Sequence, residues 1–312
     1  MAETVEWHLR CPSVTTLASG TTAARSTAAA YVALTKPRII VQLLITTVPT
    51  MIVAQRGLPG IWLIVATMIG GTFAAGGANA VNMYVDRDID KIMKRTQGRP
   101  IVTGEIAPRN ALVFSVGLLV IAGAWLAVYV NPLSAVLALT AAGIYIFIYT
   151  LWLKRTSSQN IVIGGAAGCM PVLVGWAAVT NTLALEPFVL FAVIFLWTPP
   201  HFWALAVKYK DEYSAADVPM MPSVASLEST SRQIVAYAIA VWAVGVAFGP
   251  IASLGWIYLA TSIVTGGMFT FYSVQLLRAP DSKKAMKVFT FSLTYLTALF
   301  IAMGVDVLVL PL

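Results

Sequence analysis

The sequence predicts an all-α, polytopic membrane protein with nine transmembrane helices, and three observations support this. Hydrophobic residues make up 59% of the 312 residues, and the mean hydropathy is +0.82. Charged residues make up only 11%, whereas soluble chains carry about 25%, so most of the exterior must face lipid. The apolar residues gather in nine runs, each with the roughly 20 residues that a spanning helix needs. This composition excludes secreted, disordered and cytosolic proteins.

The nine expected spans account for nearly the whole chain. Two pairs of spans are divided only by turn residues, namely Asn131-Pro132 and Leu254-Gly255. In chain order, the spans are residues 38–56, 61–82, 108–129, 132–151, 161–180, 187–207, 233–253, 255–277 and 288–310.

The distribution of basic residues tests this count, because an error of one span would scramble it between alternate loops. If the N-terminus is cytoplasmic, all of the 20 Lys and Arg residues except Arg56 fall on the cytoplasmic side. The net charge of +7 is therefore explained first by topology, and nine spans from a cytoplasmic N-terminus place the C-terminus on the outer side. A bacterial inner membrane is the expected setting, because Glu3 and Glu6 in the N-terminal arm also argue against a transit peptide. Clusters follow the second, fourth, sixth and eighth spans: Lys91, Lys94, Arg95 and Arg99; Lys154 and Arg155; Lys208 and Lys210; Arg278, Lys283, Lys284 and Lys287.

Residues 1–35 are expected to form a poorly ordered cytoplasmic arm before a single transmembrane domain, 36–312. The arm contains Glu3 and Glu6 and no apolar core, which argues against a cleaved signal peptide. The two cysteines are Cys11, in this arm, and Cys169, inside a span, so they predict neither a disulfide framework nor a thiolate metal site.

The sharpest motif lies at the end of the second span and reads Asn82-Met-Tyr-Val-Asp86-Arg-Asp-Ile-Asp90. Residues four apart share a helix face, so these three converge at the membrane edge, while Asp88 points away from Asp86. Carboxylate and amide oxygens are suitable ligands for Mg²⁺, and phosphate oxygens of a substrate usually complete its coordination shell. Charges near hydrocarbon are costly and usually functional, which favours a site over a solvated helix end.

A second acidic cluster follows the sixth span. If that helix runs on to Glu212, then His201, Lys208 and Glu212 lie on one stripe with Asp211 on its flank. Such a stripe would form a second binding site for metal or diphosphate. The clusters begin 125 residues apart (211 minus 86), which indicates a weak internal duplication.

Two further groups leave their roles open. His201 follows Trp197-Thr-Pro-Pro inside an apolar helix, where it is a packed core residue, an axial ligand of haem iron or a polar contact to substrate. Lys154 and Arg155 close the fourth span, and the positive-inside rule alone explains them unless their loop folds towards the acidic clusters. The pairs Gly70-Gly71, Gly76-Gly77 and Gly164-Gly165 are expected to be close-packing sites between helices.

The first motif, continued by Arg95-Thr96 and Arg99-Pro100, resembles the first aspartate-rich motif of the UbiA superfamily of intramembrane prenyltransferases. The resemblance implies a nine-helix bundle around a central cavity. Loops 83–107 and 208–232 would cap this cavity from the cytoplasmic side and bind Mg²⁺ with diphosphate.

Other motifs resemble the branch of that superfamily that farnesylates protohaem IX. This likeness implies transfer of the farnesyl group of farnesyl diphosphate to a vinyl group of haem B, which gives haem O for terminal oxidases. Lys208 stands where many relatives carry a carboxylate, so it is expected to bind diphosphate directly. The motifs are Tyr149-Thr to Lys154-Arg155, Asn160-Ile-Val-Ile-Gly-Gly165, Trp197-Thr-Pro-Pro-His201-Phe-Trp, Lys208-Tyr-Lys-Asp211-Glu212-Tyr and Val218-Pro-Met-Met-Pro222.

The resemblance also implies residue roles, cofactor and partners. Catalysis would rest on Asn82, Asp86, Asp90, Lys208 and Asp211, and Mg²⁺ would be held by Asn82, Asp86, Asp90, Asp211 and Glu212. Diphosphate would be bound by Lys94, Arg95, Arg99, Lys154, Arg155 and Lys208, and haem by His201 and Trp197. The expected partners are farnesyl diphosphate, haem B and membrane lipid, but no nucleic acid. Contact with haem A synthase or oxidase assembly proteins is a further expectation.

Two other functions fit part of the sequence. A prenyltransferase for an aromatic quinone precursor or a chlorophyll-type acceptor would use the same acidic motifs, and only the motifs of the haem branch argue against it. A transporter would also contain broken helices and intramembrane polar groups. Transporters place such groups near the midplane, often at inverted repeats, whereas these acids gather at one membrane face.

Overall fold

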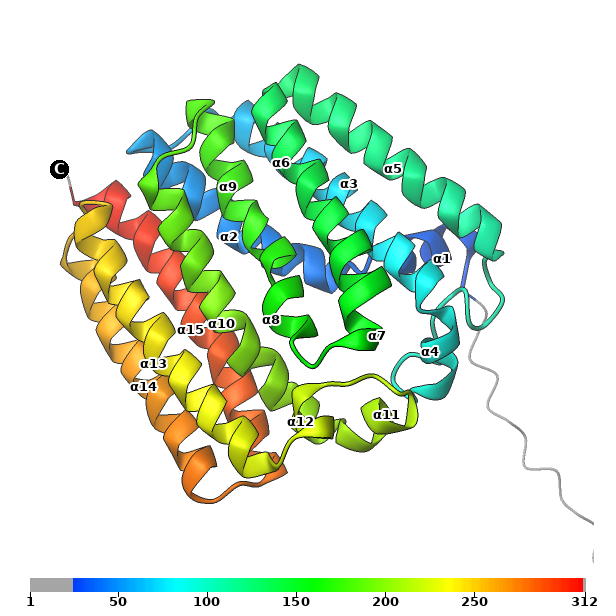
Figure 1. Ribbon diagram of the computed structural model, residues 1–312. Coiled ribbons are helices and arrows are strands. Elements are labelled where there is room, and N and C mark those ends of the chain that lie inside the picture. Colours follow the sequence, from blue (N-terminus) through cyan, green and yellow to red (C-terminus); the bar gives the residue numbers. More distant parts are fainter. Residues whose placement is uncertain (1–24, 311–312) are drawn as a thin grey trace, which may run out of the picture.

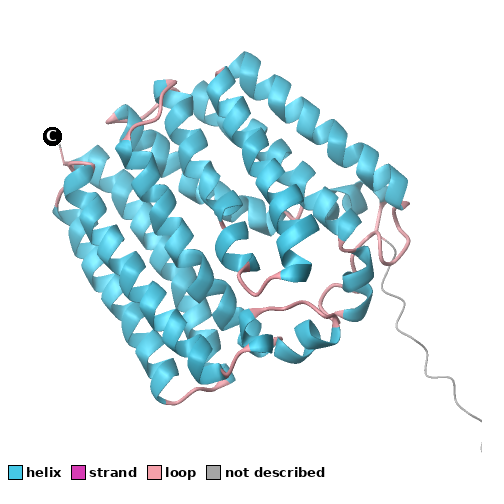
Figure 2. Ribbon diagram, viewed as in Figure 1, coloured by secondary structure: helices cyan, strands magenta, loops and turns pink. Residues whose placement is uncertain are grey.

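The computed structural model describes residues 25–310, which form helices and connecting turns without a strand (Figures 1 and 2). Within this range nine helical stretches are long and apolar enough to cross a membrane, which confirms the predicted fold class and number of spans. They are Pro37–Gln55 (α2), Ile61–Val85 (α3), Pro108–Tyr129 (α5), Pro132–Thr156 (α6, η1 and α7), Asn160–Thr180 (α8 and α9), Leu185–Lys208 (α10), Leu227–Ile251 (α13), Trp256–Arg278 (α14) and Ser282–Val309 (α15).

Two spans begin earlier than their apolar runs predict. Helix α13 starts at Leu227 rather than 233, and α15 starts at Ser282 rather than 288. In both cases a capping side chain accepts a hydrogen bond from a backbone N–H of the first turn: Ser226 caps α13, and Asp281 caps α15. The first turns are polar, so hydropathy alone does not detect them.

The expected N-terminal arm falls mostly outside the described residues, which leave out 1–24 and with them Cys11. Its last part forms a short helix, α1 (Thr27–Leu34), which the sequence analysis did not predict. The Ser26 side chain caps it by accepting from the Ala29 backbone N–H. Leu34 on α1 is fully buried, and the ring of Tyr31 lies 4.9 Å from that of Phe114 on α5, so α1 is packed onto the bundle.

The long helices run side by side and form one continuous bundle (Figure 1). Helix α3 packs on α5, α9 packs against α2, α6 and α10, and α15 packs against α2, α10 and α14. Glycines permit the closest approaches, as predicted for three pairs: a Cβ at Gly77 would lie 2.9 Å from the Ser115 carbonyl oxygen. Gly71 is the exception, because a Cβ there would meet no atom within 4 Å.

Short helices gather at one end of the bundle, which we call the loop end. They are α4 (Arg87–Ile92), α11 (Lys210–Ala215) and α12 (Met221–Val224), and the end of the span that includes α7 lies beside them (Figure 1). Arg56 lies at the opposite end, where its Nη1 donates to the Ala252 carbonyl oxygen at 2.6 Å. This contact ties α2 to the end of α13 and gives the one basic residue outside the positive-inside pattern a structural role.

Candidate functional site

The three residues of the first motif lie together at the loop end, as their spacing predicts. The chain bends between α3 and α4 at Asp86, but two helical hydrogen bonds persist across the bend. The Asp86 N–H donates to the Asn82 carbonyl oxygen at 2.9 Å, and the Asp90 N–H donates to the Asp86 carbonyl oxygen at 2.8 Å. Asn82, Asp86 and Asp90 are buried, with exposed fractions of 3%, 0% and 2%. Asn82 Nδ2 donates to Asp86 Oδ2 at 2.7 Å. The motif therefore forms a buried acidic cluster rather than a solvated helix end.

Basic side chains from three separate segments meet this acidic cluster. Lys154 Nζ contacts Asp86 Oδ2, and Arg99 Nη1 lies 2.5 Å from Asp90 Oδ2. Lys36 Nζ donates to Asn82 Oδ1 at 2.7 Å. Three basic side chains thus face two carboxylates, and this arrangement suits an anionic ligand, which would also favour the charged form of Lys36.

The cost of burying these charges appears in two groups outside the spans. Burial raises the pKa of Asp90, against the opposing charge of Arg99. Burial, together with the nearby charges of Arg99 and Lys154, lowers the pKa of Lys36 to about 7. Charged groups that are held out of water in this way are typical of functional sites.

Asp88 faces away from the acidic cluster, as the helical spacing predicts. Its carboxylate accepts two hydrogen bonds of 2.7 Å from Arg155, and the Asp88 side chain is 60% exposed. The Arg155 hydrogen bonds hold the pKa of Asp88 well below its usual range. Arg155 therefore lies in an exposed pair beside the site, while its neighbour Lys154 points inward to Asp86.

Two polar residues of this site were missed by sequence reasoning. Lys36 was counted only as a positive-inside charge, yet it adopts a left-handed backbone conformation (φ 54°) and reaches Asn82. Thr150, on η1 (Ile144–Leu153), accepts a 3.1 Å hydrogen bond from Asn82 Nδ2. A lysine directly before a proline at the start of the first span is the signal that would have pointed to Lys36.

The predicted stripe in the second cluster is wrong. Helix α10 ends at Lys208, and Tyr209 leaves the helical conformation (φ −107°, ψ 20°) before α11 begins. The break separates Asp211 and Glu212 from the helix that carries His201 and Lys208. His201 is buried, whereas Lys208 and Asp211 are exposed. In the part of the chain that the structure describes, no ion pair joins these residues to the acidic cluster.

The two loops nevertheless meet, because other residues join them. Arg95 Nη2 donates to the Tyr213 hydroxyl at 2.7 Å, and its guanidinium lies over the rings of Tyr209 and Tyr213. Ile89 and Met93 of the first loop share an apolar cluster with residues of the second loop, among them Tyr213, Val218 and Met220. Loops 83–107 and 208–232 are thus in contact with each other, and Lys94 of the first loop is exposed.

The donor set fits a hard cation completed by phosphate oxygens. Asp86 Oδ1 and Glu212 Oε2 are both buried and accept no hydrogen bond, so one carboxylate oxygen on each loop is left without a partner. Within residues 25–310, no three His, Cys, Asp or Glu side chains lie close enough to hold a metal by themselves. Mg²⁺ is commonly bound by one or two carboxylates together with substrate phosphates, and one unpartnered carboxylate oxygen on each loop is consistent with this mode of binding.

His201 lies apart from the loops, between α10 and α15. Its ring stacks on Trp197 (centroids 4.2 Å apart) and on Phe289 (4.6 Å). Its Nδ1 lies 2.6 Å from Ser292 Oγ, and Ser292 donates its only hydroxyl proton to the Phe289 carbonyl. A proton on His201 Nδ1 is compatible with both contacts of Ser292, and this tautomer would leave the lone pair on Nε2 to bind a metal or accept a proton.

Membrane-spanning helices with a buried cluster of carboxylates and basic side chains at one end are the features of an integral membrane protein with a charged site at the membrane surface. The chain belongs to the UbiA prenyltransferase family, whose model matches residues 43–302. This match confirms the resemblance seen in the aspartate-rich motif.

Curated relatives match most of the chain. A protoheme IX farnesyltransferase of Pseudarthrobacter chlorophenolicus is 52% identical over 302 residues, which cover 94% of this chain and 93% of the relative. Proteins of the same name from Clavibacter michiganensis subsp. michiganensis and Frankia alni are 50% and 48% identical and cover 89% and 90% of this chain.

Solved structures share the fold at low sequence identity. A digeranylgeranylglyceryl phosphate synthase has a TM-score of 0.77 at 17% identity, and covers 92% of this chain and 100% of its own. A UbiA homolog from Archaeoglobus fulgidus bound to GPP and Mg²⁺ has a TM-score of 0.65 at 18% identity, and covers 90% of this chain and 100% of its own.

Proposed function

We propose that this protein transfers the farnesyl group of farnesyl diphosphate to a vinyl group of haem B, releasing diphosphate and giving haem O for terminal oxidases. The observation that carries the proposal is the buried acidic cluster, in which Lys154 and Arg99 already lie against Asp86 and Asp90. The relatives named protoheme IX farnesyltransferase support the choice of acceptor.

Metal binding is proposed for residues of both loops. Asn82, Asp86 and Asp90 would hold Mg²⁺ together with Glu212 and Asp211, since two of these carboxylates present buried oxygens without a partner. The A. fulgidus homolog with bound GPP and Mg²⁺ supports this cofactor. When bound, Mg²⁺ would supply positive charge to the departing diphosphate.

The basic side chains would stabilise the same negative charge. The C–O bond between the farnesyl group and diphosphate breaks, and its electron pair leaves with the diphosphate oxygen. Arg99 and Lys154 are fixed beside this position, and the exposed Arg95, Lys94 and Lys208 stand at its edge. Preorganised cations in a buried site are worth more than in water, so this stabilisation is the main contribution of the chain.

The acceptor completes the reaction. The allylic carbon takes an electron pair from the haem vinyl group, so a C–C bond forms. Water then adds to the resulting cation and loses a proton, which leaves a hydroxyethylfarnesyl side chain. We propose that His201 Nε2 binds the haem iron, with Trp197 beside it, because a proton on Nδ1 shared with Ser292 Oγ would leave Nε2 free.

A product assay tests the prenyl transfer, and a haem-binding measurement tests the role of His201. Purified protein given haem B, farnesyl diphosphate and Mg²⁺ should form a product with the mass of haem O, and chelation of Mg²⁺ should stop it. His201→Ala should weaken haem binding and shift the absorption spectrum of the bound haem. Prenylation of an aromatic quinone precursor or a chlorophyll-type ring in place of haem B would refute the choice of acceptor.

The protein is a multi-pass membrane protein, and we propose that it lies in the bacterial inner membrane with the N-terminus and loop end cytoplasmic and the C-terminus outside. The basic residues at the loop end support this orientation. In a Cys11→Ser background, an impermeant thiol reagent should label Leu58→Cys on intact spheroplasts, and Lys283→Cys only after lysis. The reverse pattern would contradict the orientation. Haem A synthase and oxidase assembly proteins remain proposed partners.

A further inference from the structure

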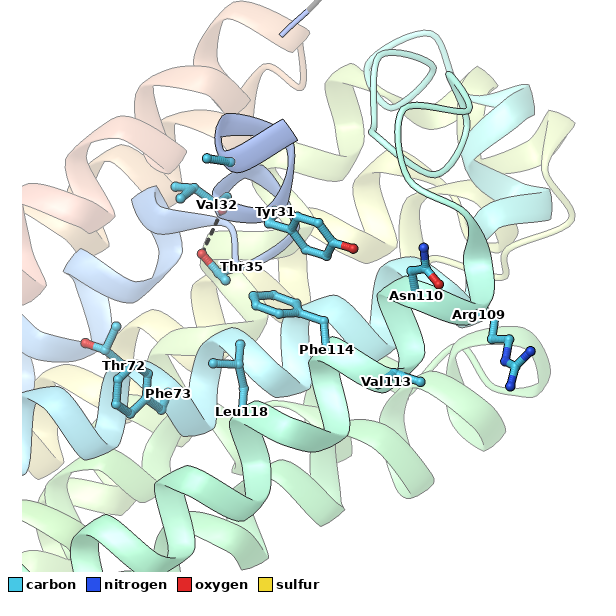
Figure 3. Close-up of a pocket in the computed structure, with 11 residues that line it drawn as sticks. Tyr31, Val32, Thr35, Thr72, Phe73, Arg109, Asn110, Val113, Phe114 and Leu118 are labelled. Atoms are coloured by element: carbon cyan, nitrogen blue, oxygen red, sulfur yellow. Dashed lines mark hydrogen bonds between the residues drawn. The ribbon is translucent and has the colours of Figure 1, made fainter. Parts of the chain in front are cut away.

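We propose that a groove between α1, α3 and α5 binds one anionic phospholipid from the leaflet at the loop end. The groove has a volume of about 920 Å³ and opens on the outside of the bundle. Figure 3 shows Tyr31 and Thr35 on one side of it, Phe114 and Leu118 on α5, and Phe73 on α3. None of these residues belongs to the machinery proposed for prenyl transfer.

The polar end of the groove is built to receive an anion. Arg109 and Asn110 stand in the first turn of α5, a helix that has neither a side-chain cap nor an acidic residue in that turn. Their backbone N–H groups come before the first intrahelical hydrogen bond and face the helix terminus. Among the described residues, no ion pair includes the Arg109 guanidinium, and the nearby Glu105 pairs with Arg25 at 3.9 Å.

The groove is the right length for one leaflet. Its α5 wall runs from Arg109 to Leu118, and nine steps of about 1.5 Å give roughly 13 Å, close to half of the 30 Å hydrocarbon core. Val113 and Phe114 make the wall between these two residues apolar (Figure 3). The charged head of a phospholipid at the membrane edge would meet the polar end of the groove, and its acyl chain would lie along the apolar wall.

The charge of the groove selects a phosphodiester over the diphosphate substrate. Among residues 25–310, no carboxylate lines the groove, so these residues offer no ligand for a divalent cation, and Arg109 is the one cationic residue in this described lining. A phospholipid head carries a single phosphate charge, which one guanidinium and two N–H groups can bind. Basic pockets at the cytoplasmic ends of transmembrane helices commonly bind anionic lipid heads in this way.

The groove also touches the structure that positions Lys36. Thr35 lines the groove, and its carbonyl oxygen accepts a 2.9 Å hydrogen bond from Asn79 Nδ2 on α3. The next residue, Lys36, reaches Asn82 in the acidic cluster. A lipid packed against Tyr31 and Thr35 would therefore hold α1 against α3 and keep the Lys36 side chain in its position beside Asn82.

Lipid retention tests the proposal directly. The full chain, purified in neutral detergent, is titrated with palmitoyl-oleoyl phosphatidylglycerol or with the matching phosphatidylcholine, and bound lipids are counted by native mass spectrometry. We expect one phosphatidylglycerol to be preferred, and Arg109→Gln to weaken that preference about fivefold, the effect of one basic residue. Arg278→Gln, an exposed arginine at the loop end of α14, should leave it unchanged.

A phosphatidylglycerol with a photoreactive acyl chain locates the bound lipid and should crosslink to peptides of α1 or α5. Equal retention by the parent protein and Arg109→Gln would overturn the proposal, as would crosslinks confined to other helices. Displacement of the lipid by farnesyl diphosphate, or a dimer that buries the groove and excludes lipid, would also overturn it. Because lipid binding is measured without turnover, these outcomes are independent of the prenyl-transfer proposal.

Discussion

Replacing Asp86 by Asn should lower the rate of haem farnesylation by about 10²–10³-fold, the usual cost of removing one preorganised electrostatic group from an active site. Asp86 is fully buried, and its Oδ1 accepts no hydrogen bond, so this oxygen is left to bind a metal ion. Asn keeps the shape but removes the charge that would hold Mg²⁺. The measurement is haem O formed per minute at saturating Mg²⁺.

Asp281→Asn is the matched control for this prediction. It makes the same carboxylate-to-amide change at the loop end, on an exposed residue that caps α15, and Asn is an equally good cap. Its turnover should stay near that of the parent protein. Undiminished turnover of well-folded Asp86→Asn would remove Asp86 from the metal role.

Lys154→Met should destabilise the protein by about 3–5 kcal/mol, because it leaves the carboxylate of Asp86 buried without its cation. The Lys154 side chain is 14% exposed and that of Asp86 is 0% exposed, so water cannot replace the lost partner. The measurement is thermal unfolding in detergent, followed by tryptophan fluorescence.

A double variant separates the ion pair from other effects of Lys154. Asp86→Asn combined with Lys154→Met removes both charges, so it should recover most of the stability lost in Lys154→Met while remaining inactive. A double variant that is as unstable as the sum of the single changes would show that the pair does not interact.

The sequence predicted those parts of the fold and site that depend on local spacing. Asn82, Asp86 and Asp90 are four residues apart on nearly continuous helix, so their convergence followed from helical geometry. The nine spans followed from apolar runs of the length that a bilayer requires.

What the sequence did not predict depends on contacts between distant segments. Thr150 is 68 residues from Asn82, and Ser292 is 91 residues from His201, and no periodicity connects such pairs. The break at Tyr209 was missed because α11 turns away to bury Tyr213 against the first loop, a tertiary contact that overrides the helical pattern. Lys36 was not predicted as a site residue because the positive-inside rule already explained a lysine at the cytoplasmic start of the first span.

Binding of diphosphate to the two loops tests the central claim most directly. Titration calorimetry with Mg²⁺ and farnesyl thiodiphosphate, a slowly reacting analogue, would compare the parent protein with Asp86→Asn, Glu212→Gln and the exposed control Glu228→Gln, whose residue pairs with Arg232. We predict Mg²⁺-dependent binding that is weakened by the change in either loop and unaffected by the control. Binding that is independent of Mg²⁺, or that loses nothing in Glu212→Gln, would contradict a site shared by both loops.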